Sequence, residues 1–229
     1  MERALILAAG LGTRLRPLTD KIPKALVESG GRTLLEHSIG HLKRYGIKHI
    51  IINIHHFPEQ IIDFLRCHNN FGLEIAISDE SDELLDTGGG LKKAGWFFSG
   101  TEPFVVRNVD ILSDLDLEAM CRFHLRNHAV ATLAVRSRET SRYLVFDENR
   151  QLCGWKNISA GKSIQTRVPE GNTYDYAFSG IQVLSPGIIP LISEGGRFSL
   201  VDLYLRLAAA QKIVCFEDKG SVWQDAGKN

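Results

Sequence analysis

Short apolar runs alternate with helically spaced apolar positions through the first 135 residues of the chain. A run such as 4–8 is too short for a lone helix and is typical of a strand buried on both faces of a parallel sheet. The pattern predicts strands at 4–8, 48–53, 73–77, 103–106 and 130–135, and helices that start near Leu34, Pro58 and Leu117. This alternation indicates an α/β protein with a mainly parallel sheet covered on both faces.

The pattern changes character in the second half of the chain. Strands are predicted at 143–146, 152–155 and 174–184, joined by turns rich in Asn, Gly and Pro. The stretch 159–172 is polar and poor in large apolar residues, and we interpret it as a flexible hairpin or lid. Helical spacing returns at 188–192 and 200–210, before a last strand at 213–216. No repeat or linker interrupts the pattern, so we expect a single domain over 1–229.

Length and charge narrow the choice of partners. A chain of 229 residues suits one α/β domain and is short for two. Lys plus Arg number 27 and Asp plus Glu number 27, so no overall basic field directs the chain to nucleic acid or to a membrane surface. No apolar run approaches the ~20 residues of a membrane span. With four scattered cysteines and no signal-peptide layout at the start, we expect a cytoplasmic protein with reduced thiols.

The first candidate site follows the first strand. Gly10 and Gly12 let the backbone turn tightly and bring its N–H groups close to a ligand, where they hold phosphate oxygens well. Arg14 and Lys24 add a fork-shaped cation and a point charge, both suited to a polyphosphate. A plain strand-to-helix turn is the alternative interpretation. A dinucleotide-binding fold would need a third glycine where Leu15 stands.

A second glycine-rich string, Thr87-Gly88-Gly89-Gly90, opens a segment with helical spacing. Three glycines there allow a planar ring or a backbone to approach closely, although a loose turn would have the same composition. We interpret the acidic residues just before the string as a solvated loop: Asp79, Glu80, Asp82 and Glu83.

Asp110 lies just past the carboxyl end of the strand predicted at 103–106. Open α/β sheets bind ligands at that edge, and a carboxylate there can hold Mg²⁺, which prefers oxygen ligands and bridges to phosphates. An aspartate in this place is equally common as a helix cap or turn former. The sequence therefore makes Asp110 a candidate metal ligand.

The string from Leu7 to Lys24 reads Leu-Ala-Ala-Gly-x-Gly-Thr-Arg-Leu-x-Pro-Leu-Thr-x-x-x-Pro-Lys. It resembles the signature of the sugar-1-phosphate nucleotidyltransferases at every fixed position. The resemblance weakens toward the C-terminus but spans essentially the whole chain. It implies a Rossmann-like, glycosyltransferase-A-like three-layer fold with a mixed, mainly parallel central sheet. It also implies a nucleotide-binding part at 1–135 and a sugar-phosphate-binding part at 140–229.

The resemblance assigns roles to particular residues. Arg14 and Lys24 are the catalytic cations, and the residues implied to contact the nucleotide are Ala8, Ala9, Gly10, Gly12, Thr13, Arg14, Thr87, Gly88, Gly89 and Asn108. Mg²⁺ is implied on Asp110 and on Asp225 of the string Trp-Gln-Asp-Ala-Gly. Val109 stands where the family has glycine between its Asn and Asp.

The sugar side of the resemblance is less specific. Ser179 and Gly180 are implied to touch the sugar ring, and Lys156, beside Asn157, to face the sugar phosphate. An exposed hairpin lysine is the competing interpretation of Lys156. Asp202 either caps a helix or reaches the sugar hydroxyls.

The implied reaction joins an NTP and a sugar 1-phosphate into an NDP-sugar and pyrophosphate, with Mg²⁺. The sugar phosphate is already an anionic nucleophile, so the reaction needs no general base and no covalent intermediate. The chain most resembles the small enzymes that use UTP and N-acetylmuramic acid 1-phosphate, and next the GTP-using enzymes for mannose or heptose 1-phosphate. A non-catalytic nucleotide-sugar sensor and a dinucleotide oxidoreductase are the alternatives from other classes. The sequence gives no indication of the oligomeric state.

Overall fold

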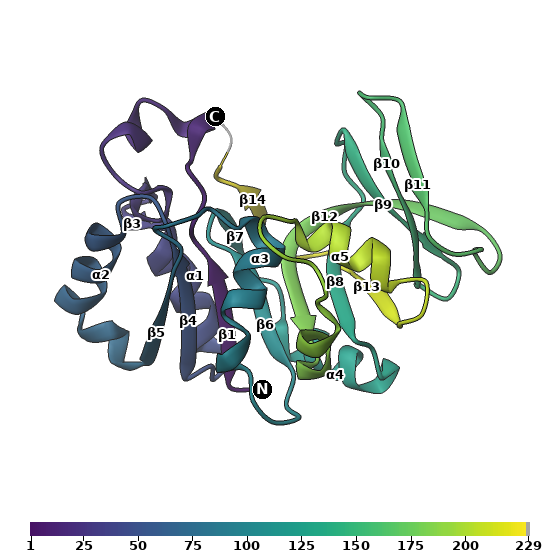
Figure 1. The fold of residues 1–229 in the computed structure, drawn as a ribbon, viewed down its shortest axis with the longest axis horizontal. Helices are drawn as coiled ribbons and strands as arrows, with labels where there is room; N and C mark the ends of the chain where they lie inside the picture. The colour runs from purple at the N-terminus through teal and green to yellow at the C-terminus, as the bar shows by residue number, and fades with distance from the viewer. Residues whose placement is uncertain (228–229) are drawn as a thin grey trace.

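The computed structural model describes residues 1–227. Its centre is a parallel unit of four strands in the order β6-β1-β4-β5 (Figure 1). Every side chain of β1 after Arg3 is buried, as expected for a strand covered on both faces. The predicted strands 4–8, 48–53, 73–77 and 103–106 are confirmed, with these bounds: β1 (Arg3–Leu7), β4 (His49–Ile54), β5 (Glu74–Asp79) and β6 (Phe104–Asn108).

Helices cover both faces of this sheet and make three layers. Ala4 and Ile6 of β1 pack with one set of helices, whereas Leu5 and Leu7 pack with the other, because successive side chains of a strand point to opposite faces. The first set is α1 (Leu34–Arg44), α2 (Pro58–Cys67) and α4 (Leu117–Asn127). The second set is α3 (Asp86–Lys93) and α5 (Leu200–Leu207).

Local signals in the sequence place the helix ends. The Thr33 side chain accepts from the Glu36 N–H, and the Glu36 carboxylate accepts from the Thr33 N–H, which completes a capping box for α1. Pro58 occupies the first turn of α2, where its missing N–H costs nothing. The segment predicted as helix at 188–192 is instead a 3₁₀ helix, Pro186–Leu191, with Pro190 inside it. The helix predicted to run to 210 ends at Leu207.

The second half of the chain adds antiparallel strands to the edge of β6. The long strand β12 pairs with β6 at its end and with β9 at its beginning, so one strand joins the two halves of the sheet. The strands β9, β10 and β11, which we call the arm, project to the right in Figure 1. The polar stretch 159–172 contains β11, which completes a hairpin with β10. The bounds are β9 (Arg142–Asp147), β10 (Leu152–Asn157), β11 (Lys162–Gln165) and β12 (Thr173–Leu184).

The remaining strands attach to this framework. β8 pairs with β12, and β13 runs parallel to β8. Two short antiparallel pairs, β2 with β3 and β7 with β14, lie outside the main sheet. The bounds are β2 (Glu28–Ser29), β3 (Arg32–Thr33), β7 (Ile111–Ser113), β8 (Ala131–Arg136), β13 (Ile213–Glu217) and β14 (Trp223–Asp225). Through the β7–β14 pair, the last described residues return to the edge where β6 ends.

Two histidines are buried in this framework with both ring nitrogens engaged. His124 Nε2 lies 2.9 Å from Ser185 Oγ, which itself donates to the Ala129 carbonyl, so Nε2 carries the proton and Nδ1 accepts from Thr132 Oγ1. His41 Nε2 likewise lies 2.9 Å from the Leu115 carbonyl, a pure acceptor. Burial lowers the pKa of each histidine to about 4, with the nearby Arg107 adding to the effect at His41. Both rings are therefore neutral at pH 7.

We predict that stability falls as pH drops from about 6.5, the ordinary histidine pKa, to about 4, the pKa of His41 and His124 in the folded chain. In that window the unfolded chain binds more protons, so each histidine contributes a slope of roughly 1.4 kcal/mol per pH unit. Urea unfolding of the wild type and of His124→Gln at pH 7, 6 and 5 measures this slope of stability against pH. The variant should lose its share of the slope, and equal slopes in the two proteins would contradict the assignment.

Candidate functional site

The loop after β1 takes its shape from Gly12. This residue has a φ of 65°, and a Cβ there would lie 2.7 Å from Thr19 Cγ2 and 3.0 Å from Lys24 Cβ. Thr19 Oγ1 donates to the Gly12 carbonyl at 2.9 Å, which ties the loop to the segment that leads to Lys24. Only glycine satisfies both the backbone conformation and this close approach.

The loop forms one wall of a cleft of about 520 Å³, which we call the loop cleft. The cleft lies at the carboxyl ends of β1, β4 and β6, where open α/β sheets bind ligands. It brings together most of the residues predicted for the nucleotide and metal. Its lining residues are Leu7, Ala9, Gly10, Leu11, Gly12, Thr13, Arg14, Lys24, Asn53, Leu84, Asp86, Thr87, Asn108, Asp110 and Arg197.

A buried polar chain that the sequence interpretation missed supports the loop cleft from below. The Ala8 N–H donates to Asn53 Oδ1 at 2.6 Å, so this N–H is used within the fold and is not available to a ligand. Asn53 Nδ2 donates to Glu80 Oε1 at 2.8 Å, and Glu80 Oε2 accepts from the Leu85 N–H at 3.2 Å. Burial raises the pKa of Glu80. The chain therefore ties the ends of β1, β4 and β5 to the start of α3.

The interpretation of Glu80 as part of a solvated loop is wrong, because Glu80 is fully buried. The other three acidic residues, Asp79, Asp82 and Glu83, are exposed as expected. The positions of the two residues along the chain could have indicated that Glu80 is buried. Asn53 and Glu80 stand at the ends of β4 and β5, and neighbouring parallel strands bring their ends to one edge.

The glycines of α3 leave room for the segment 196–200 to pack closely against this helix. A Cβ at Gly88 would overlap the Phe198 ring, and one at Gly89 would lie 2.7 Å from the Gly196 carbonyl oxygen. The Gly88 N–H donates to the Phe198 carbonyl at 2.9 Å, so the close approach fixes this segment against α3. Gly88 and Gly89 are buried there, whereas Thr87 lines the loop cleft and Arg197 lines it from the docked segment.

Asp110, from the middle of the chain, and Asp225, from near its C-terminal end, come to one place. β14 pairs with β7 so that Asp225 lies opposite Ile111, and the Ala226 N–H donates to the Asp110 carbonyl at 2.9 Å. A Cβ on Gly227 would touch Asp110 Oδ2 and would lie 3.1 Å from Asp225 Oδ1 and 2.8 Å from Lys24 Nζ. The two carboxylates and the ammonium therefore surround one point.

The chemistry of this group fits a divalent cation. Lys24 forms an ion pair with Asp110, and these side chains are 13% and 11% exposed. Carboxylate oxygens are the ligands that Mg²⁺ prefers. Within residues 1–227 no cluster of three or more His, Cys, Asp or Glu groups is present, so water and phosphate oxygens would complete the coordination of such an ion.

Val109, which stands where the family has glycine, does not disturb the turn between β6 and β7. It packs into the core at 2% exposure, and its N–H donates to the Leu7 carbonyl at 3.1 Å. Its own carbonyl accepts from Ser38 Oγ at 3.2 Å. The valine therefore fixes the β6–β7 turn against β1 and α1.

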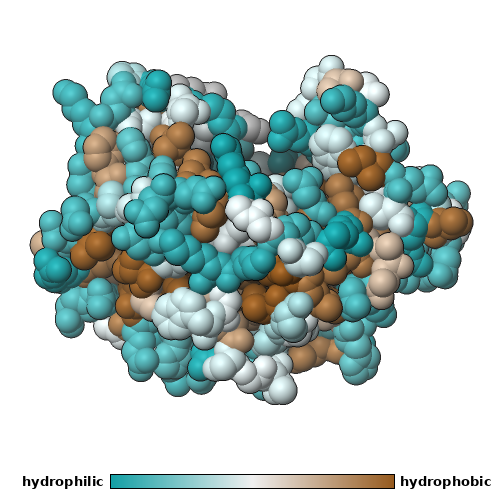
Figure 2. Space-filling model, viewed as in Figure 1, coloured by the Kyte–Doolittle hydropathy of each residue, from teal (hydrophilic) through white to brown (hydrophobic). Residues whose placement is uncertain are grey.

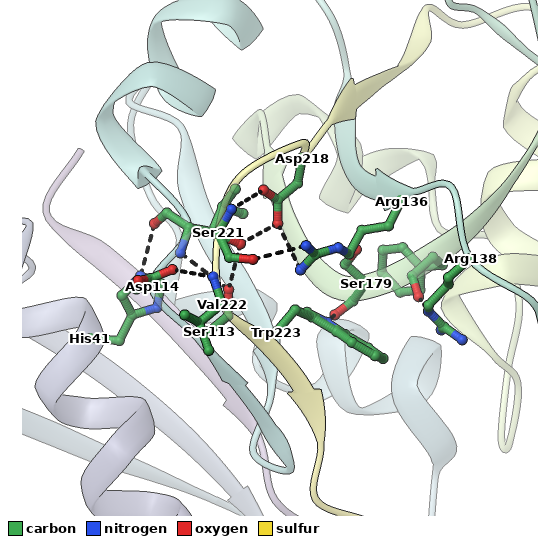
Figure 3. A network of polar contacts seen from close by, with 12 residues as sticks. His41, Ser113, Asp114, Arg136, Arg138, Ser179, Asp218, Ser221, Val222 and Trp223 are labelled. Carbon is green, nitrogen blue, oxygen red and sulfur yellow. Dashed lines mark hydrogen bonds and ion pairs between the residues drawn. The ribbon is translucent and has the colours of Figure 1, made fainter.

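A network of polar contacts holds the segment that leads into β14 (Figure 3). The Asp218 carboxylate accepts from both the N–H and the hydroxyl of Ser221, and it lies 3.5 Å from Arg136 Nη1. Arg136 Nη2 donates to the Ser221 carbonyl at 2.8 Å. Trp223 Nε1 donates to the Ser179 carbonyl at 2.9 Å. These contacts fix β14, and with it Asp225, against the rest of the fold.

A second cleft of about 550 Å³ opens between the arm and α5, and we call it the arm cleft. It shares Asp86 with the loop cleft, so the two clefts meet at that residue. In Figure 2 the upper edge of the molecule is hollowed between the N-terminal half and the arm. The arm cleft is lined by Asp86, Arg138, Thr140, Arg142, Tyr143, Leu144, Trp155, Ile164, Phe178, Ser199, Val201, Asp202 and Leu205.

The residues predicted for the sugar lie in different places. Asp202 lines the arm cleft and also belongs to the cap of α5, because Ser199 Oγ accepts from the Asp202 N–H and donates to its carboxylate. Ser179 is buried, and its hydroxyl has no hydrogen-bond partner among the described residues. Gly180 has a φ of 76°, and a Cβ there would lie 2.7 Å from Ile111 Cγ1.

Lys156 and Asn157 do not line either of these two clefts. Lys156 Nζ lies 2.9 Å from each carboxylate oxygen of Asp175. Asn157 Oδ1 accepts from Ser159 Oγ and from the Ala160 N–H in the turn that follows β10. The cations in the arm cleft are Arg138 and Arg142, which sequence reasoning did not single out.

Comparison with known proteins confirms the resemblance. The chain belongs to the nucleotidyl transferase family, whose model matches residues 3–229. It is 32% identical to a mannose-1-phosphate guanyltransferase of Yarrowia lipolytica over 99% of this chain, but it spans only 61% of that protein's length. It is also 32% identical to an N-acetylmuramate alpha-1-phosphate uridylyltransferase of Caulobacter vibrioides, over 98% of this chain and 91% of that protein.

The fold agrees with solved structures of the same class. The crystal structure of HddC from Yersinia pseudotuberculosis superposes with a TM-score of 0.77 at 23% identity, covering 100% of this chain and 95% of that one. The predicted α/β fold with its mixed, mainly parallel sheet is therefore confirmed. Among residues 1–227, no helix has the length and hydropathy that a membrane crossing requires.

We predict that Gly90→Ala destabilises the protein although alanine favours helix. A Cβ there would lie 2.7 Å from Asn53 Nδ2 and 2.9 Å from Glu80 Oε1, and both groups are buried and hydrogen-bonded. Overpacking of this kind costs about 1–3 kcal/mol. Gly40→Ala, in α1 with open space around it, is the matched control and should gain about 0.5–1 kcal/mol. Urea unfolding compares them, and a Gly90→Ala variant as stable as Gly40→Ala would contradict the packing described here.

Proposed function

We propose that this chain transfers a nucleotidyl group from an NTP to a sugar 1-phosphate, releasing pyrophosphate. The observation that carries the proposal is the convergence of Asp110, Asp225 and Lys24 at a loop built from Gly10 to Arg14. The relatives' names support it, since both describe transfer of a nucleotidyl group to a sugar 1-phosphate. A cleft for phosphates that meets a second cleft fits two substrates held side by side.

The residues of the loop cleft suit an in-line displacement between two anions. The sugar phosphate attacks the α-phosphorus of the NTP, the bond to the β-phosphate oxygen breaks, and pyrophosphate leaves with the electron pair. The attacking oxygen is already ionised, so the protein has to hold the anions in line and screen their repulsion. Arg14 is exposed in the cleft, and with the N–H groups of Gly10 to Thr13 it is placed to bind the departing pyrophosphate.

Asp110 and Asp225 would hold Mg²⁺. A bound Mg²⁺ supplies positive charge that polarises phosphate oxygens and stabilises the transition state. Lys24 pairs with Asp110 in the structure, and its ammonium would also be a donor for a phosphate oxygen.

For the particular substrates we propose UTP and N-acetylmuramate 1-phosphate. The arm cleft contains two arginines, Arg138 and Arg142, and the relative that is named for N-acetylmuramate 1-phosphate is a uridylyltransferase. N-acetylmuramate 1-phosphate carries a carboxylate in addition to its phosphate and would engage both cations, whereas mannose 1-phosphate has a single anionic group. GTP with mannose or heptose 1-phosphate is the second candidate.

A panel of four NTPs against a set of sugar 1-phosphates tests this proposal through pyrophosphate release. We expect Mg²⁺-dependent release that is fastest with UTP and N-acetylmuramate 1-phosphate. Release with GTP and mannose 1-phosphate instead would select the second candidate. Nucleotide binding without release from any pair would show the non-catalytic sensor.

We predict that Lys24→Ala and Asp110→Ala each lower kcat by about 100-fold or more, the usual effect of losing one transition-state contact. Lys21→Ala is the matched control, because Lys21 is an exposed lysine of the same segment and lies outside the residues that line the loop cleft. Steady-state kinetics under saturating substrate and Mg²⁺ give the comparison. Wild-type turnover in either of the first two variants would remove that residue from the mechanism.

A further inference from the structure

The cation that the family resemblance assigns to the sugar phosphate, Lys156, has a carboxylate partner on β12. Both oxygens of Asp175 lie 2.9 Å from Lys156 Nζ, so its charge is already compensated. The arm cleft has its own cation close to Asp225. We propose that Arg138, and not Lys156, binds the phosphate of the sugar 1-phosphate. This inference rests on the proposed function and names a substrate-binding residue within it.

Arg138 is held in place by an aromatic ring and two backbone carbonyls. Its guanidinium carbon lies 4.4 Å from the centre of the Trp223 ring, and the two side chains lie beside each other in Figure 3. Nη2 donates to the Phe178 carbonyl at 3.2 Å, and Nη1 to the Glu139 carbonyl at 3.4 Å. Nε is buried and has no hydrogen-bond partner among the described residues. Stacking on an aromatic ring orients a guanidinium without using its N–H donors.

The charge of Arg138 acts on Asp225, one of the two proposed metal ligands. Burial lowers the pKa of Arg138, and the nearby Asp225 opposes that effect. An arginine remains charged at pH 7 under these conditions. Partial burial also strengthens its attraction for an anion, because less water screens the two charges.

The position of Arg138 matches where the attacking phosphate has to lie. That phosphate must reach the NTP beside Asp110 and Asp225, while the sugar it carries extends into the arm cleft. Arg138 lines the arm cleft and stacks on Trp223, which precedes Asp225 by two positions in β14. Arg138 is therefore a cation of the arm cleft that lies close to a proposed metal ligand, and a planar guanidinium can bind two phosphate oxygens at once.

The test compares three substitutions of Arg138 in the full chain. Arg138→Gln keeps a planar group on Trp223 without the charge, Arg138→Met removes both, and Arg138→Lys restores the charge. KM is measured for N-acetylmuramate 1-phosphate with UTP and for mannose 1-phosphate with GTP. We expect the Gln and Met variants to raise KM for the sugar 1-phosphate by about 10- to 100-fold, the loss of a charge-assisted hydrogen bond. The Lys variant should have a KM for the sugar 1-phosphate between those of the Gln variant and the wild type.

Two further measurements separate phosphate binding from a structural role. In the Gln and Met variants, KM for the NTP and the Mg²⁺ concentration for half-maximal rate should stay within about twofold of wild type, because Lys24, Asp110 and Asp225 keep their places. Arg122→Met, an exposed arginine on α4, is the control that should leave every constant unchanged. Lys156→Met should raise KM for the sugar 1-phosphate less than Arg138→Gln does.

Four results would overturn the inference. A rise in the Mg²⁺ requirement together with the sugar 1-phosphate KM would show that Arg138 only supports Trp223 and β14. A larger effect of Lys156→Met would return the role to Lys156. If the enzyme is active and the Gln and Met variants have unchanged KM values, Arg138 is excluded as the phosphate-binding residue and the proposed function stands. If the wild type uses neither sugar 1-phosphate, the proposed substrates are contradicted, and the inference with them.

Discussion

The structure depends on bringing two carboxylates that are distant in sequence, Asp110 and Asp225, to one ammonium, that of Lys24. Asp110 and Asp225 would repel each other in a partly buried site if no cation lay between them. Lys24 supplies a positive charge against Asp110, Arg138 lies near Asp225, and a divalent cation would bind the carboxylate oxygens of the two aspartates. A cleft that attracts a cation in this way can also accept the phosphates that the cation bridges.

The rest of the fold fixes the parts of this arrangement in advance. Asn53 accepts from the Ala8 N–H below the loop, and Glu80 in turn accepts from Asn53, which fixes the base of the loop. Arg136 and Asp218 hold the segment before β14, and without them nothing local in the sequence would place Asp225 opposite Ile111. Fixed donors of this kind do not have to reorganise when charge develops in a reaction, which is the usual source of electrostatic catalysis.

The sequence predicts the central sheet well because its strands are buried on both faces and read as unbroken apolar runs. The loop around Gly12 is also predictable, since its glycine is demanded by the local backbone. The surroundings that the sequence does not indicate depend on contacts between distant segments. Glu80 is charged and sits in a polar stretch, and only the pairing of β4 with β5 shows that Asn53 covers it. Gly88 and Gly89 approach the segment 196–198, which no local pattern indicates.

Lys156 and Arg138 show the same limit on the sugar side. A motif locates a lysine along the chain but not the carboxylate on the neighbouring strand that pairs with it, here Asp175. Arg138 follows the end of β8 and becomes part of the arm cleft only when β14 brings Trp223 underneath it. Side chains whose roles depend on strand pairing across the whole chain are therefore the ones that the sequence alone assigns least well.

The most direct test of the account is anomalous diffraction from crystals soaked with Mn²⁺ and a nucleotide, since Mn²⁺ takes the same oxygen ligands as Mg²⁺. The account predicts an anomalous peak coordinated by carboxylate oxygens of both Asp110 and Asp225, with the nucleotide phosphates beside it against the Gly10–Arg14 loop. Bound nucleotide with Mn²⁺ elsewhere, or with Asp225 turned away from the ion, would contradict it.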